Sequence, residues 1–136
     1  MTTRRQRYIN ELVAALQAAG VPAEVSTTID GAFSREEGAV LVLHRGREVP
    51  AASASGSTVR ECELRISTVT RGDDPEQAAD DVMEVVHPIL MAFKSTALMM
   101  VSEQGTDEPK YADGKVCLIT THYIMKYATG PKTLGD

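Results

Sequence analysis

Polar and apolar residues alternate from Val59 to Thr70, and no other feature of the chain constrains its fold as strongly. Extended at about 3.3 Å per residue, this segment reaches roughly 40 Å. A compact domain of 136 residues is roughly 36 Å across, so the strand is expected to overhang the body of its own subunit. The alternation weakens at Val69, which indicates a bulge or a change of environment. One face carries Cys62, Leu64 and Ile66, and the other carries Glu61, Glu63 and Arg65.

A second long strand is expected over Lys115–Ala128. Neither of its faces is plainly a solvent face. Two helices cannot easily cover both sides of so long a sheet, so part of the second face is expected to meet another molecule. One face carries Cys117, Ile119, Thr121, Tyr123, Met125 and Tyr127, and the other carries Val116, Leu118, Thr120, His122, Ile124 and Lys126.

The first helix is expected over Arg4–Gly20, with Thr2 or Thr3 as its N-cap. Apolar side chains recur on one face, and Gly20 followed by Pro22 provides a stop. The single apolar stripe predicts a helix that lies against another layer. Its members are Ile9, Leu12, Val13, Leu16 and Ala19.

The second helix is expected to begin with Asp74 as N-cap, Pro75 at N1 and Gln77 as the capping-box residue at N3. Pro88 lies inside the helical pattern and predicts a kink over Glu84–His87 or a break before His87. The apolar face consists of Ala78, Ala79, Val82, Val85, Val86, Ile89, Leu90 and Phe93.

The remaining segments give weaker signals. Shorter strands are expected over Ala23–Ile29, Ala39–Leu43 and Thr96–Glu103. Mobile loops are expected over Gly46–Ser57 and Gln104–Lys115, with turns at Asp30-Gly31 and Asp113-Gly114.

Together these elements predict one α+β (mixed α/β) domain over residues 1–129. Its sheet is expected to be mainly antiparallel with long strands, and two principal helices are expected to pack on it. Residues 130–136 are expected to form a flexible C-terminal tail.

Composition excludes several classes of protein. A net charge of −5 and a pI near 5.2 argue against a protein that grips nucleic acid through its phosphates. No apolar run is long enough for a membrane span. Arg4, Arg5 and Arg7 are not followed by the apolar core of a signal peptide, so synthesis in the cytoplasm is expected.

The residues capable of chemistry are not arranged for it. His44, His87 and His122 are scattered without metal-ligand spacing. Cys62 and Cys117 are expected as buried thiols inside strands, and His122 should point away from Cys117. We therefore expect no catalytic, cofactor-binding or metal-binding residues. Helix capping and a polar helix face account for Asp73, Asp74, Asp80 and Asp81, and Ser53, Ser55 and Ser57 lack a nucleophile motif.

Three segments carry a resemblance to a known family. They are the strand before Gly72-Asp73-Asp74-Pro75, the helix ending in Val86-His87-Pro88-Ile89-Leu90-Met91, and the final tyrosine-containing strand. With the N-terminal helix they resemble tail terminator proteins of long-tailed bacteriophages, the lambda-type minor tail protein U family. The similarity extends roughly from Arg4 to Thr129.

The resemblance implies a mixed α/β subunit that forms a ring, a hexamer in this family, on the completed tail tube. The ring would stop tube polymerisation and offer a docking surface for the head. Implied partners are other copies of the chain, the tail tube protein and a head–tail connector protein, with DNA only passing through the lumen. The place of action would be the head-proximal end of the virion tail, without enzymatic activity or a cofactor. Another head–tail joining component, or a small ligand-binding or enzymatic subunit, remains an alternative.

Overall fold

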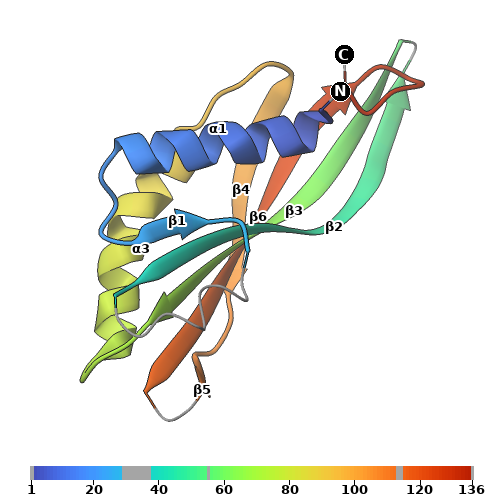
Figure 1. Ribbon diagram of the computed structural model, residues 1–136. Coiled ribbons are helices and arrows are strands. Elements are labelled where there is room, and N and C mark those ends of the chain that lie inside the picture. Colours follow the sequence, from blue (N-terminus) through green and yellow to red (C-terminus); the bar gives the residue numbers. More distant parts are fainter. Residues whose placement is uncertain (1, 29–37, 55, 113–114, 136) are drawn as a thin grey trace.

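In the part of the chain that the structure describes, the fold is a single curved sheet with two helices packed against it (Figure 1). The computed structural model describes residues 2–28, 38–54, 56–112 and 115–135. The turns expected at Asp30-Gly31 and Asp113-Gly114 lie outside these ranges. In chain order the described elements are α1 (Arg4–Ala18), β1 (Glu24–Ser26), β2 (Val40–Ala54), β3 (Ser57–Thr70), α3 (Pro75–Met91), β4 (Leu98–Thr106), β5 (Lys110–Ala112) and β6 (Val116–Thr129).

The sheet has six strands in the order β1-β2-β3-β6-β4, and β5 pairs with β6 beyond the end of β4. β1 runs parallel to β2, whereas the other pairs are antiparallel. The fold class stated from the sequence is therefore corrected. The sheet is mixed but mostly antiparallel, and its helices are not crossover connections of a parallel α/β sheet, so the protein is α+β and not mixed α/β.

Local signals set the ends of both helices. Thr3 caps α1, its hydroxyl accepting a hydrogen bond from the backbone N–H of Gln6 at 3.3 Å. Asp74 caps α3, its carboxylate accepting from the backbone N–H of Gln77 at 3.2 Å. The capping-box prediction is wrong, because the Gln77 amide donates to Asp81 instead. The expected break before His87 is also wrong, because α3 is one helix from Pro75 to Met91 with Pro88 inside it.

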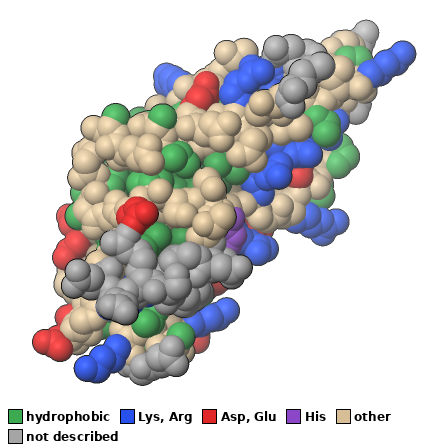
Figure 2. All heavy atoms as spheres, in the orientation of Figure 1, with side chains coloured by type: hydrophobic (Ala, Val, Ile, Leu, Met, Phe, Trp, Pro, Cys, Tyr) green, Lys and Arg blue, Asp and Glu red, His purple; other side chains and the backbone are tan. Residues whose placement is uncertain are grey.

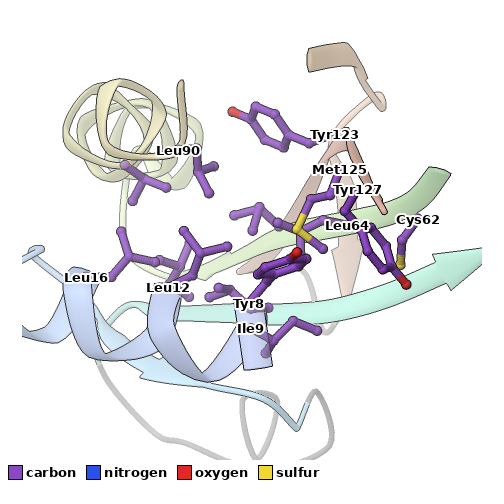
Figure 3. Close-up of a cluster of buried hydrophobic side chains, with 14 of the residues drawn as sticks. Tyr8, Ile9, Leu12, Leu16, Cys62, Leu64, Leu90, Tyr123, Met125 and Tyr127 are labelled. Atoms are coloured by element: carbon purple, nitrogen blue, oxygen red, sulfur yellow. The ribbon is translucent and has the colours of Figure 1, made fainter. Parts of the chain in front are cut away.

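The core lies between the two helices and one face of the sheet (Figure 3). Tyr8 of α1 is buried in this core. The Tyr8 hydroxyl donates a hydrogen bond to the carbonyl of Thr96 at 2.7 Å. Its ring meets that of Tyr127 edge-on, at 5.3 Å between centroids. The alternation predicted for β3 and β6 is confirmed at the core. The fully buried core side chains include Leu12, Leu16, Leu64, Ile66, Leu90, Tyr123, Met125 and Tyr127.

Two segments expected to be mobile loops contain strands. Gly46–Ser57 belongs almost entirely to the β2–β3 hairpin, which pairs as far as Ala54 with Ser57. Half of Gln104–Lys115 lies in the end of β4 and in β5. Neither segment has a regular apolar pattern. Its strands form because the backbone pairs with a long neighbouring strand. The register shifts in the described sheet lie in β2, between Arg45 and Glu48 and between Pro50 and Ala52, and in β4, between Leu98 and Met100 and between Glu103 and Gly105. None of them is near Val69.

The hairpin of β2 and β3 extends beyond α1 (Figure 1). Residues after β6 return to the start of α1, where the N–H of Arg4 donates to the carbonyl of Leu134 at 2.9 Å. The flexibility expected of residues 130–136 stays a prediction. In the described part of the chain, neither helix has the length and apolar character needed to cross a membrane.

Replacing Leu64 by Ala should lower the free energy of unfolding by about 2–5 kcal/mol, because Leu64 is fully buried and a cavity would remain. Urea denaturation measures this. Met99→Ala is the control, since Met99 is 59% exposed, and its effect should stay within about 0.5 kcal/mol. Equal losses for the two variants would contradict the assignment of the core.

Candidate functional site

A polar cluster on the sheet face opposite the helices is the strongest candidate for a site. The registers place His44 of β2, Arg65 of β3 and His122 of β6 side by side across the sheet. Glu63 lies two residues before Arg65 on the same face, and Asp107 follows β4. Strand alternation therefore brings together groups from four separate parts of the chain.

His122 is the centre of this cluster. Its Nε2 lies 2.9 Å from Oδ2 of Asp107, and its Nδ1 lies 3.2 Å from Oε1 of Glu63. Arg65 donates from its guanidinium to the same Glu63 oxygen. A neutral imidazole has one N–H, so it can donate to only one of the two carboxylates, whereas the imidazolium can donate to both. The geometry therefore favours the charged form of His122.

The electrostatics agree with this geometry. The hydrogen bond with Asp107, reinforced by the one with Glu63, raises the pKa of His122. The Arg65 hydrogen bond lowers the pKa of Glu63, and that of His122 lowers the pKa of Asp107. Each charged group has a partner of opposite sign within the cluster, so none is poised as a free general base or nucleophile.

His44 belongs to a separate, neutral chain of hydrogen bonds. Its Nε2 lies 3.0 Å from the hydroxyl of Ser67, which lies 2.8 Å from the hydroxyl of Thr120. Burial, followed by the positive charge of Arg65, lowers the pKa of His44. The pKa of His44 is thus below the usual value for histidine, whereas the pKa of His122 is above it.

A second candidate lies on the helix side of the sheet. A cavity of about 620 Å³ is lined by Arg5, Arg45, Gly46, Glu48 and Cys62. Glu48 accepts from both Arg5 and the hydroxyl of Tyr127. Burial raises the pKa of the Cys62 thiol to about 11, which makes it a poor nucleophile. Glu48 therefore links Arg5 of α1 to Tyr127 of β6, which is a contact that holds the helix on the sheet.

The residues whose convergence would favour an enzyme lie on two sides of the sheet. His44 and His122 are on the face opposite the helices, whereas Tyr123 and Tyr127 are buried against the helices. The hydroxyl of Tyr123 meets Nδ1 of His87 at 2.8 Å. The sheet lies between the two pairs, so they form no common cleft.

The other candidate residues that the structure describes are dispersed over the fold. Among the described residues, no three His, Cys, Asp or Glu side chains are grouped to hold a metal ion. The carboxylates of Glu63 and Asp107 contact opposite edges of the His122 ring and so cannot share one centre with it. Cys62 and Cys117 are free and buried, as predicted. Ser55 lies outside the described residues, and Ser57 begins β3.

Sequence reasoning missed Asp107 and Glu48. Asp107 lies in a segment predicted to be a loop and follows the end of β4, and its backbone N–H donates to the carbonyl of Thr120 next to the β4–β6 pairing. Glu48 lies in Gly46–Ser57, which its small residues, glycines and Pro50 predict to be a loop, and the β2 bulges interrupt the alternation there. The inward position of Glu48 follows only from its pairing with Cys62.

Comparison with known proteins adds no assignment. No family model matches the chain, and no curated protein matches its sequence.

His122 should make stability depend on pH above neutrality. Because its pKa is raised on folding, its stabilisation is complete below about pH 6.5, the unfolded value. It is then lost as the pH rises through the folded value. The difference in unfolding free energy between the wild type and His122→Gln should therefore shrink from pH 6 to pH 9.

Urea titrations across this pH range give the unfolding free energy of each protein. Subtracting the value of His122→Gln from that of the wild type cancels the contribution of His44, which both proteins share. Asp107→Asn is the matched control, because it keeps the shape of the side chain and should flatten the same profile. A difference in unfolding free energy between the wild type and His122→Gln that does not change with pH would contradict a charged His122 between Asp107 and Glu63.

Proposed function

We propose that this chain is a structural subunit of a phage or prophage tail that caps the completed tail tube as a ring. The ring ends tail polymerisation and provides the surface to which the head docks. Its partners are other copies of the chain, a hexamer by the family's pattern, together with the tail tube protein and a connector protein. It acts at the head-proximal end of the virion tail after synthesis in the host cytoplasm.

The observation that carries this proposal is the excess of sheet over helix. β2, β3 and β6 are 15, 14 and 14 residues long, while both described helices pack on one face. The β2–β3 hairpin projects past α1 (Figure 1). A sheet that exceeds its own cover is typical of a subunit that is completed by neighbours.

The distribution of exposed apolar groups supports the same proposal. Met91, Met99 and Met100 are among the large apolar side chains that are exposed, and they border a groove of about 480 Å³ beside β4. Flexible methionine side chains suit a surface that must fit another molecule.

The absence of reactive groups in the polar cluster supports a structural role over an enzymatic one. His122, Glu63, Asp107 and Arg65 are paired with one another, and the cluster ties β3, β6 and the residue after β4 together. The net charge of −5 suits a ring through which DNA passes without adhering. The proposal therefore includes no catalysis and no cofactor.

Added protein should arrest the growth of cognate tail tubes at a fixed length. Electron microscopy of tubes assembled with and without it measures the length distribution and the ring at the tube end. Tubes of unchanged length would contradict the terminator function. Binding to connector complexes without binding to tubes would instead favour another head–tail joining component.

A further inference from the structure

Each edge strand of the described sheet has a stretch without a strand partner on its outer side. The two stretches lie at the same level along the strands, as the registers show. β1 pairs with β2 only at Val40–Val42, and no described strand continues that side of β2 toward its hairpin end. At the other edge, β4 pairs with β6 on one side, and no described strand lies on its other side. Unpaired edge strands offer backbone N–H and C=O groups to another chain.

The heights follow from the registers. Thr106 of β4 is level with Leu43 of β2, through Thr121 of β6 and Ile66 of β3. At the other end, Leu98 is level with Pro50, through Tyr127 and Arg60. The whole of β4 thus spans the part of β2 that begins where its pairing with β1 ends.

The directions of the two edges also match. β2, β3, β6 and β4 are antiparallel in succession, so β2 and β4 run in opposite directions. If two copies stand side by side in the same orientation, β4 of one copy therefore lies antiparallel to β2 of the next. The contact uses different surfaces on the two copies, so it can repeat around a closed ring.

Two pairs of side chains at the same level are complementary, one on each face. On the helix side, Glu103 is level with Arg45, and both are exposed. On the side opposite the helices, Met100, which is 54% exposed, is level with Val49. Opposite charges and apolar pairs are the combinations that stabilise adjacent antiparallel strands.

The charges around the two edges extend this match. Figure 2 shows Lys and Arg side chains gathered around the middle of β2, where Arg45 and Arg47 are exposed. Around the end of β4, Glu103 and Glu108 are exposed. Arg45 and Glu103 lie on opposite edge strands of one sheet, so their attraction acts between copies and not within one copy.

We propose that β4 of one subunit pairs antiparallel with β2 of the next, over Leu98–Thr106 and Leu43–Pro50, to join the sheets of a ring. This inference rests on the proposed function, because it supplies the contact between copies. Two bulges in each strand and Pro50, which lacks an N–H, hinder pairing in other registers. They restrict the edge to one partner.

Cysteine cross-linking tests the register directly. Val49 and Met100 of one chain are separated by β3 and β6, roughly 14 Å at the usual strand spacing, which is too far for a disulfide. Mild oxidation of Val49→Cys/Met100→Cys should therefore give a ladder of covalent oligomers up to the size of the ring. Each single variant should give no ladder, and Cys62 and Cys117 are buried.

A charge exchange tests the specificity of the contact. Arg45→Glu and Glu103→Arg should each weaken association about five- to tenfold, and the variant carrying both should recover it. Glu84→Arg, on the exposed face of α3, is the matched control for a reversed carboxylate. Sedimentation velocity measures association, and circular dichroism verifies folding.

The outcomes separate this inference from the proposed function. Wild-type protein that caps tubes, with no ladder and with unaltered association of the charge variants, would overturn the edge pairing alone. Wild-type protein that neither self-associates nor binds tubes would overturn both. A ladder combined with recovery in the doubly exchanged variant is the result expected.

Discussion

The backbone pairing of β2, β3 and β6 is the interaction on which the rest of the structure depends. These strands form the longest ladders of the fold, with β3 between the other two. Their length fixes the size of the sheet, and α1 and α3 then bury one of its faces around Tyr8, Leu64 and Leu90. The same ladders align His44, Arg65 and His122 on the opposite face. Both the core and the polar cluster are consequences of one register.

The polar cluster has a structural interpretation within this frame. Pairing His122 with carboxylates on both ring nitrogens uses the donors that an acid–base catalyst would need for a substrate. It also links β3, β6 and the residue after β4 at the edge of the sheet. That edge carries Glu103 and Met100, so the cluster holds in place the strand that we propose meets the next subunit. In this account the charged groups shape a surface for assembly.

The sequence predicted those parts of the fold that depend on local chemistry. Thr3 and Asp74 begin helices because their side chains accept backbone hydrogen bonds, and the alternation of β3 identifies its buried face without knowledge of its partners. The hairpin half of β2 was missed because its small residues and bulges carry no apolar period, and its order comes from pairing with β3. The contacts of His122 with Asp107 and Glu63 were missed for the same reason, since register between distant strands has no local signal.

Amide hydrogen exchange tests the edge-pairing proposal most directly. In dilute, dissociated protein the outward-facing amides of β4 have no strand partner among the described residues, and they should exchange rapidly. On assembly, alone or on tube ends, protection should appear in Leu98–Thr106 and Leu43–Pro50 together, while protection of β3 stays as it was. Assembly that leaves both edge segments unprotected would contradict the account.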